Sequence, residues 1–477
     1  MRGRLRLVLP ALTTVLACGL TGMQATPARA LCPAELPAAI ARVVEHPDWQ
    51  RARWGILIRE MASGRTLYAR ESERFFIPAS TAKLLTTAAA LQHFGPGWRA
   101  RTSVYGTEAS PVATELRLVG GGDPTLSREG LQVLARQVRD RGIVRVRTLV
   151  VEDSAFVEPD VVPSWEKDDI IAAYGTAANG TILHENAVTF TVVPQAVGQP
   201  PSWSWDDAIA GQQWQVTNRG VTAAAGTPYA LELRPQLGTT QLEIVGSIPA
   251  DNGPDVWELA VPHPHAYLRD VFLRELAAVG IVVERTALAR SRPPERGTEL
   301  AVIVSPPLGE LVVQANRDSN NLVAEVLLRQ LGRAVPDAGS ISVRRDRLKI
   351  LGVDPDGYAL VDGSGLSRQN LVSPEALVQT LRGVTTAPYA PLYRQSLAAG
   401  GETGTLRWRL ASLDLRAKTG TLAGVVALAG YLDPPQFAPL VFALLLNHSD
   451  RSPREQRAAL DAIVERLNQI DRCPDGR

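Results

Sequence analysis

The stretch that decides the fold is STAKLLTTAAALQHF, residues 80–94. Its alanines and leucines favour a helix, and the glycines and proline of Gly95-Pro96-Gly97 predict where that helix ends. Residues three apart lie on one helix face, so the Ser80 hydroxyl and the Lys83 amine are expected side by side. Serine becomes a nucleophile when a base takes its proton, and a lysine held neutral by burial can do so. The spacing therefore predicts a reactive serine at a helix start.

Two further short motifs follow along the chain. Ser319-Asn320-Asn321 opens a second predicted helix over 321–330, and Lys418-Thr419-Gly420, followed by Thr421, comes just before an apolar strand. Alone, each motif has an ordinary explanation, since a serine commonly caps a helix. Their order, S-x-x-K, then S-x-N, then K-T-G, is the signature of a serine site that β-lactams acylate.

On these motifs the sequence resembles the D-alanyl-D-alanine carboxypeptidase/endopeptidase family, the class C low-molecular-mass penicillin-binding proteins. The spacing of 239 positions between Ser80 and Ser319 is similar to that produced by this family's large insertion, whereas β-lactamases place the two motifs much closer. Other similar stretches are Leu118–Leu126 (LVGGGDPTL), Asp362–Arg368 (DGSGLSR), Gly404-Thr405-Leu406 and Lys418–Tyr431 (KTGTLAGVVALAGY).

The resemblance implies an α/β (α+β) fold, a penicillin-binding/β-lactamase-like transpeptidase domain whose antiparallel sheet is covered by helices. We expect a discontinuous catalytic domain at 31–100 and 298–477, interrupted by inserted β-rich domains at 101–297. Apolar periodicity and turn residues predict the local elements. A hairpin is expected over 54–70, helices over 127–141, 264–279 and 453–470, and strands over 424–432 and 439–446.

The resemblance also implies catalytic roles for four side chains. Ser80 would attack the carbonyl of the penultimate D-alanine, with Lys83 as general base. Ser319 would relay a proton to the leaving amine, and Asn321 would hold the substrate amide or Lys83.

The K-T-G stretch would bind the substrate. Lys418, with Thr419 and Thr421 across Gly420, would provide positive potential for the terminal carboxylate region. The backbone N–H groups of Ser80 and Thr421 would form the oxyanion hole.

A looser part of the resemblance concerns the peptide side chain. Asp153, Phe156 and Arg368 could contact a diaminopimelate-type side chain. For Arg368 an ion pair at the surface is an equally ordinary explanation.

Lysine usage supports the site independently of the resemblance. Of 50 basic residues only four are lysines, Lys83, Lys167, Lys349 and Lys418, and two of these fall in the motifs. Arginine cannot usefully give up its proton, so lysine stands where a proton-accepting amine is needed. The formal net charge of +1 leaves no broad positive field for nucleic acid.

The amino terminus predicts export to the periplasm or the outer face of the cytoplasmic membrane. Arginines precede the apolar run 7–20, and Ala28-Arg29-Ala30 is typical of a signal peptidase site, which would make 1–30 a signal peptide and Leu31 the mature terminus. An uncleaved anchor and lipoprotein processing at Cys18 are alternatives, and either would allow peripheral membrane association.

Cleavage there would leave Cys32 and Cys473 near the two ends of the mature chain. A disulfide between them fits an oxidising compartment, and two free thiols are the alternative.

Other motifs carry little chemistry. Gly120-Gly121-Gly122-Asp123 lacks the rest of a phosphate loop and is interpreted as a turn, and His263-Pro264-His265 has no acidic cluster near it in sequence. No metal or cofactor is expected. The expected partners are peptidoglycan stem peptides and covalent β-lactams, and the oligomeric state stays open. Rival functions are a non-catalytic wall-peptide scaffold or β-lactam sensor, and a β-lactamase or esterase of the same fold.

Overall fold

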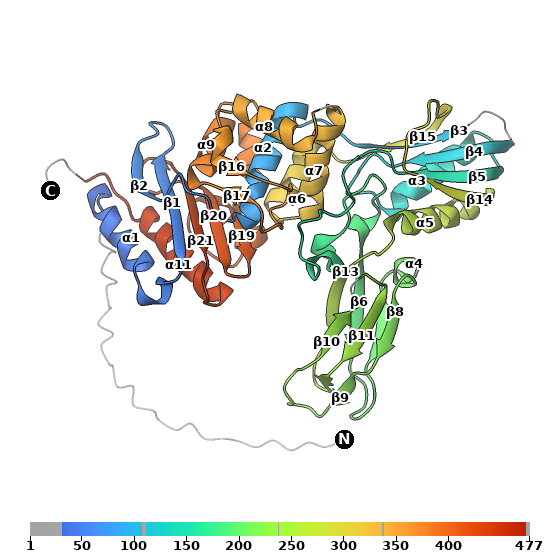
Figure 1. The fold of residues 1–477 in the computed structure, drawn as a ribbon, viewed down its shortest axis with the longest axis horizontal. Coiled ribbons are helices and arrows are strands. Elements are labelled where there is room, and N and C mark those ends of the chain that lie inside the picture. The colour runs from blue at the N-terminus through green and yellow to red at the C-terminus, as the bar shows by residue number, and fades with distance from the viewer. Residues whose placement is uncertain (1–30, 107–110, 237, 336–337, 474–477) are drawn as a thin grey trace, which may run out of the picture.

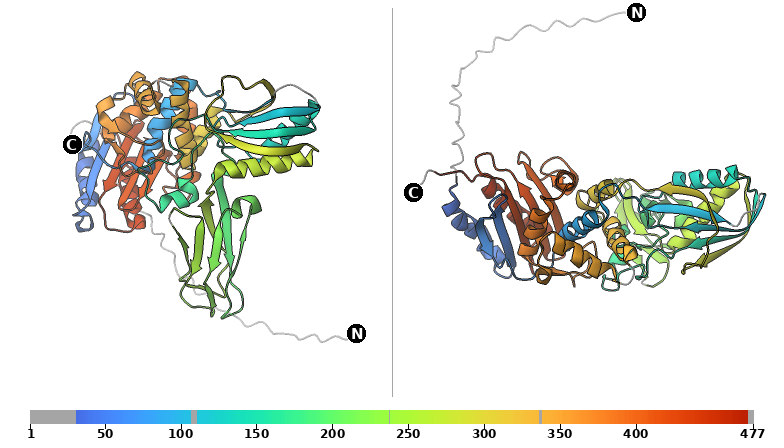
Figure 2. Two further views of the ribbon diagram at one scale, coloured as in Figure 1. Left: turned by 45° about the vertical axis from the view of Figure 1, so that its right-hand side comes forward. Right: turned by 90° about the horizontal axis from the view of Figure 1, so that it is seen from above.

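The computed structural model describes residues 31–106, 111–236, 238–335 and 338–473 (Figure 1). The predicted signal segment 1–30, including Cys18, lies outside the described residues. A large domain built from both ends of the chain carries two inserted lobes. The views in Figure 2 agree in placing both lobes beyond α7 (Asn321–Ala334), away from α1 (Leu36–Val44) and α11 (Pro453–Asn468).

A six-stranded sheet forms the centre of the large domain, in the order β18-β19-β20-β21-β1-β2. The strand β1 from the amino-terminal third pairs antiparallel with β21 from the carboxy-terminal third, which joins the two parts of the domain. The predicted hairpin and both predicted strands are confirmed. The bounds are β1 Arg53–Glu60, β2 Thr66–Arg70, β18 Ala398–Ala399, β19 Leu415–Leu422, β20 Val425–Leu432 and β21 Leu440–Asn447.

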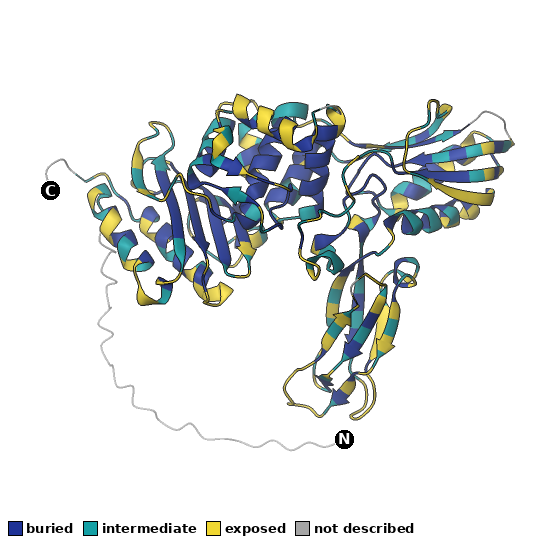
Figure 3. Cartoon of the chain, in the orientation of Figure 1, coloured by how far each residue is buried: buried dark blue, intermediate teal, exposed yellow. Residues whose placement is uncertain are grey.

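Both faces of this sheet are covered, because β20 and β21 are apolar at every second position on each side (Figure 3). Ala429 and Ala443 face a helical layer, while Leu428 and Leu444 face the layer made by α1 and α11. The helices are α1 Leu36–Val44, α2 Lys83–Phe94, α6 Leu308–Asn316, α7 Asn321–Ala334, α8 Ser340–Ile350, α9 Pro374–Val384, α10 Ala390–Gln395 and α11 Pro453–Asn468.

The two ends of the described chain are tied together. Cys32 and Cys473 form a disulfide with their Cα atoms 5.6 Å apart, and Leu31 pairs with Ile470 in a parallel bridge.

The first inserted lobe is a five-stranded sheet, β14-β5-β4-β3-β15, with α3 and α5 packed together against it. Since β15 pairs antiparallel with β3, the insertion runs to Val304, and the boundary expected at residue 297 is wrong by one strand. The bounds are β3 Arg101–Gly106, β4 Val112–Val119, α3 Arg128–Asp140, β5 Arg145–Glu152, α5 Pro264–Ala278, β14 Val282–Ala289 and β15 Thr298–Val304.

The second inserted lobe is smaller and built of short strands, in sheets ordered β13-β6-β7, β10-β11-β8 and β12-β9 (Figure 1). A bridge between Ala172 and Leu259 ties this lobe to a segment that lines the active site. The bounds are β6 Ala187–Val193, β7 Ser202–Trp205, α4 Ala208–Gly211, β8 Gln215–Asn218, β9 Val221–Ala223, β10 Glu232–Pro235, β11 Gln241–Val245, β12 Ser247–Pro249 and β13 Asp255–Ala260.

Candidate active site

Ser80 lies in a short 3-10 turn, Ala79–Ala82, that leads directly into α2. The α-helix itself begins at Lys83, three residues later than the sequence predicts, and Ser80 is not its cap. Ala79 has a φ of 47°, a left-handed conformation that costs energy for a residue with a side chain. The turn leaves the half-buried Ser80 hydroxyl pointing to Lys83 rather than to the helix backbone.

Lys83 is fully buried, and its Nζ contacts three oxygens: Ser80 Oγ at 2.8 Å, Asn321 Oδ1 at 2.7 Å and the Ser364 carbonyl at 2.7 Å. The amide and carbonyl oxygens can only accept hydrogen bonds. The charged amine can donate to all three oxygens. The neutral amine still donates to two of them and can turn its lone pair toward Ser80 Oγ to accept the serine proton. The contacts thus suit both protonation states between which a general base alternates.

Burial lowers the pKa of Lys83 from 10.5 to about 7, although the nearby Asp362 and Glu325 act in the opposite direction. A base with a pKa near the working pH is effective, because much of it is neutral while it still binds a proton well. The position of Lys83 therefore meets both the geometric and the electrostatic requirement for a general base.

Ser319 and Asn321 lie at the start of α7. Asn320, not Ser319, caps this helix, since its Oδ1 accepts a hydrogen bond from the Val323 N–H at 3.0 Å. Ser319 adopts a left-handed φ of 64°, and its Oγ lies 2.8 Å from Lys418 Nζ. The capping role is filled by the neighbour, and Ser319 is free for the site.

Lys418 lies within β19, next to this serine, and also donates to the Thr419 carbonyl at 2.9 Å. Burial and the nearby Lys83 hold the pKa of Lys418 well below its usual value. A methyl group at Gly420 would lie 2.7 Å from the Pro78 carbonyl and 3.1 Å from the Ser80 nitrogen. Only glycine allows β19 to lie this close to the serine turn.

These motifs border a cavity of about 480 Å³, a size typical of a ligand site. Ser80, Ser319, Asn321, Arg368 and Thr421 line it, as the sequence predicts. Among the lining residues that were not predicted from the sequence, Glu166, Asp169 and Tyr174 come from the segment 165–174, which has no periodicity or motif that would reveal it.

Arg368 combines both roles considered for it. It lines the cavity, and it forms an ion pair with Glu166 at 2.9 Å while donating to the Ala423 carbonyl at 2.9 Å. Both of its contacts lie in the cavity wall, so the guanidinium is held at the edge of the space available to a ligand.

Asp153 and Phe156 do not line this cavity, contrary to the prediction. The Asp153 carboxylate accepts a hydrogen bond from the Gly180 N–H at 2.7 Å, and Phe156 packs against the small apolar cluster that includes Ile182 and Val326. Both residues follow β5, in a stretch of chain that packs between the first inserted lobe and α7.

Asp153 instead belongs to a polar cluster around His265 that no motif in the sequence predicts. Asp153 and Asp160 lie 3.4 Å and 3.3 Å from the two ring nitrogens of His265. The Arg290 guanidinium lies 3.2 Å from Asp160 and 2.8 Å from the ring. The positive charge of Arg290 already balances these two carboxylates, as a metal ion bound there would.

A buried carboxylate is linked to Lys83 through the backbone of Gly363 and Ser364. Glu325, one turn after Asn321 on α7, accepts hydrogen bonds from the Gly363 N–H at 3.0 Å and the Ser364 N–H at 2.7 Å. The Ser364 carbonyl is in turn one of the three oxygens around Lys83. Burial and the neighbouring Asp362 raise the pKa of Glu325 to about 7.

Ser80, in the turn that leads into α2, lies beside the buried Lys83, and Ser319 lies beside Lys418 on the other wall. This arrangement defines a serine enzyme of the penicillin-binding class. Residues 36–467 match the D-Ala-D-Ala carboxypeptidase 3 (S13) family, and the chain belongs to that family.

Relatives and solved structures agree with this assignment. The chain is 34% identical over 472 residues to a D-alanyl-D-alanine carboxypeptidase of Actinomadura sp. (strain R39), covering 93% of this chain and 86% of the relative. It is 28% identical to the carboxypeptidase DacB of Mycolicibacterium smegmatis, covering 90% and 83%. The crystal structure of penicillin binding protein 4 (dacB) from Haemophilus influenzae has the same fold, with a TM-score of 0.80 at 22% identity over 90% of this chain and 98% of that one.

Proposed function

We propose that this chain is an exported serine-type D-alanyl-D-alanine carboxypeptidase, D,D-endopeptidase or both, acting on peptidoglycan stem peptides and cross-links. The observation that carries the proposal is the contact of Lys83 Nζ with Ser80 Oγ, together with the family to which the chain belongs.

The first half of the reaction would form an acyl-enzyme. The Lys83 lone pair takes the Ser80 proton, and Ser80 Oγ attacks the carbonyl carbon of the penultimate D-alanine. The backbone N–H groups of Ser80 and Thr421 would bind the oxyanion, each donor contributing about 3 kcal/mol. The close approach of β19 at Gly420 supports this pairing.

The second half would release the products. Ser319, whose hydroxyl lies against Lys418, gives a proton to the leaving amine and receives in return the proton that Lys83 took from Ser80. The amine departs as terminal D-alanine or as a second stem peptide, and Lys83 is neutral again. Water then attacks the ester, Lys83 accepts the proton of the water, and that proton passes to Ser80 Oγ as the acid product leaves. Thr419 is fixed by a 2.8 Å contact with Thr405, which supports a role in holding the substrate carboxylate.

The cavity wall supports a preference for a diaminopimelate-type side chain. Such a side chain ends in an ammonium and a carboxylate, and the wall offers the carboxylates of Glu166 and Asp169 and the guanidinium of Arg368. Groups of both signs on one wall complement a ligand end that also carries both signs.

β-Lactams would acylate Ser80 in place of the peptide. A solved structure of the Haemophilus influenzae protein, with a TM-score of 0.72 to this chain, is a complex with a β-lactam. The described residues contain no helix that is long and apolar enough to cross a membrane. Export would place the enzyme in the periplasm or at the outer face of the membrane.

The direct test is the intact mass of the purified chain after incubation with benzylpenicillin, compared with Ser80→Ala. One added acyl mass on the unsubstituted chain, absent from Ser80→Ala, is expected. A well-folded chain that gains no mass would refute the mechanism and favour the scaffold, while rapid loss of the adduct with turnover of drug would favour a β-lactamase.

A further inference from the structure

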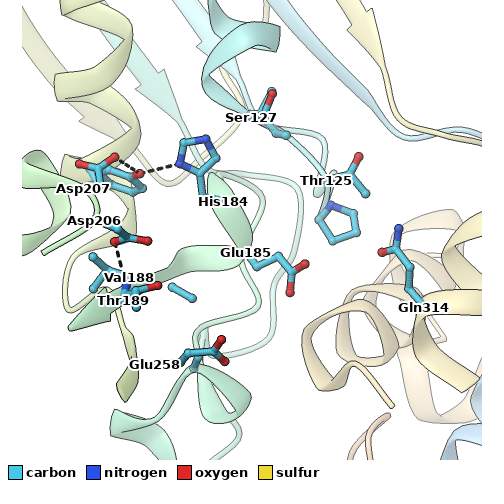
Figure 4. Close-up of a pocket in the computed structure, with 15 residues that line it drawn as sticks. Thr125, Ser127, His184, Glu185, Val188, Thr189, Asp206, Asp207, Glu258 and Gln314 are labelled. Atoms are coloured by element: carbon cyan, nitrogen blue, oxygen red, sulfur yellow. Dashed lines mark hydrogen bonds between the residues drawn. The ribbon is translucent and has the colours of Figure 1, made fainter. Parts of the chain in front are cut away.

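The insertion that carries both lobes meets the catalytic domain along an uneven boundary. Over part of this boundary a cavity of about 580 Å³ lies between them, and Gln314 on α6 faces Thr125 and Glu185 of the insertion across it (Figure 4). Beside the active site, in contrast, the three consecutive residues 164–166 contact the catalytic domain directly. This short segment is therefore a point at which the insertion can act on the catalytic groups.

Each residue of segment 164–166 contacts the same loop of the catalytic domain, residues 362–370. The central contact is a hydrogen bond from Trp165 Nε1 to the Asp362 carboxylate at 3.0 Å, and both side chains are buried. Burial strengthens such a bond, because water does not compete for the charged acceptor. The flanking contacts are Ser164 Oγ to Ser367 Oγ at 2.8 Å and Glu166 to Arg368 at 2.9 Å.

Asp362 organises loop 362–370 from within. Its carboxylate accepts hydrogen bonds from the Gly365 N–H at 2.8 Å, the Ser367 N–H at 2.7 Å and Asn370 Nδ2 at 2.8 Å. Trp165 adds a further donor, and this one comes from the insertion. A change at Trp165 leaves the three donors of the loop in place, so the negative charge of Asp362 stays where it is.

The same loop forms one side of the Lys83 environment. The Ser364 carbonyl accepts a hydrogen bond from Lys83 Nζ at 2.7 Å. Burial lowers the pKa of Lys83, whereas the charges of Asp362 and Glu325 raise it. A donor that faces Asp362 therefore changes the electrostatic environment of the base. The other charged groups around Lys83 and the two carboxylates are Lys418 on β19, Arg329 on α7 and Arg344 on α8.

We propose that Trp165 is a positioning residue for the general base, through which the insertion holds loop 362–370 against Lys83. This inference rests on the proposed function, in which Lys83 takes the Ser80 proton. The Trp165 N–H directs the positive end of its dipole at the Asp362 carboxylate and offsets part of the negative potential that favours protonated Lys83. With this donor in place, a larger fraction of Lys83 is neutral near pH 7.

The test follows the titration of Lys83 itself. The chain has only four lysines, so labelling lysine with carbon-13 at Cε gives four NMR signals, and Lys83→Arg identifies the signal of Lys83. The variant is Trp165→Phe, which keeps an aromatic ring and loses the donor. The matched control is Trp257→Phe, which removes the same kind of hydrogen bond, from Trp257 Nε1 to Asp255 Oδ2 at 3.0 Å, in the small lobe.

The titration midpoint of Lys83 should rise by about 0.5 to 1 pH unit in Trp165→Phe and stay in place in Trp257→Phe. A hydrogen bond to a charged group corresponds to about one pH unit or more, and only part of this effect reaches Lys83. Should Trp165→Phe fail to fold, benzothienylalanine at position 165 keeps both fused rings and lacks the N–H. An unchanged or lower midpoint in the folded variant, or an equal rise in the control, would overturn the proposal.

Benzylpenicillin acylation separates this inference from the proposed function. At pH 6 the acylation rate of Trp165→Phe should be about three- to tenfold below that of the unsubstituted chain, and at pH 9 the two rates should agree within about twofold. An equal loss at every pH would indicate general damage to the site and would also overturn the proposal. A chain that is never acylated, but whose Lys83 midpoint responds to Trp165→Phe, would refute the proposed function and leave the coupling of Trp165 to Lys83 standing.

Discussion

The rate of Ser80 acylation should depend on the protonation of Lys83. Burial lowers the pKa of Lys83 from 10.5 to about 7, which corresponds to about 5 kcal/mol that disfavours the charged amine. At pH 7 about half of the chains would hold a neutral base, against about one in 3,000 for an ordinary lysine. The second-order acylation rate should therefore rise about ninefold from pH 5 to pH 6 and about fivefold from pH 6 to pH 7, and level off above about pH 8.

Time-resolved intact mass with benzylpenicillin between pH 5 and pH 9 measures this profile. Lys83→Arg should lower the rate by about 10² to 10⁴, because a guanidinium cannot accept the serine proton. Lys349→Arg, at an exposed position of α8, is the matched control and should behave as the unsubstituted chain. A flat rate from pH 5 to pH 7, a midpoint near 10.5, or normal acylation of Lys83→Arg would refute the role of Lys83 as the base.

Three further outcomes are expected. Glu325→Gln removes a charge that favours protonated Lys83, so the acylation midpoint should move to lower pH; an unchanged midpoint in a folded variant would contradict the coupling. Arg368→Ala should reduce the preference for diaminopimelate over lysine stems by about fivefold in kcat/KM, given the partial exposure of Arg368, and an unaltered ratio would remove this residue from the specificity site. Cys32→Ser/Cys473→Ser should lower the free energy of unfolding by about 2–5 kcal/mol in thermal melts, and adding reductant to this variant should change nothing further.

Most of the catalytic motifs could be predicted from the sequence, because their chemistry is local. S-x-x-K spacing needs only one turn of helix to bring Ser80 and Lys83 together, and the structure places their Oγ and Nζ 2.8 Å apart. Helical and strand periodicity likewise predicted the hairpin, α3, α5 and α11 close to their observed bounds. The start of α2, the end of α7 and the boundary of the insertion were displaced.

The errors came from segments whose positions depend on distant partners. Asp153 had the right chemistry for a peptide side chain, but Gly180 and His265 hold it away from the active site. Asp169 and Tyr174 line the cavity because Ala172 is bridged to Leu259 of the small lobe, a pairing without any local signal.

The sequence by itself determined the reaction class, since the types and order of the motif residues limit which groups can attack, accept a proton and bind a carboxylate. The tertiary structure alone decided how Lys83 becomes a base, because its lowered pKa requires burial by residues far away in the chain. It also decided what surrounds the reaction. The wall around Arg368 and the contact of Lys83 with the Ser364 carbonyl both form where chain segments separated by more than a hundred residues meet. Periodicity reports which face of an element is buried, and only packing determines what that face contacts.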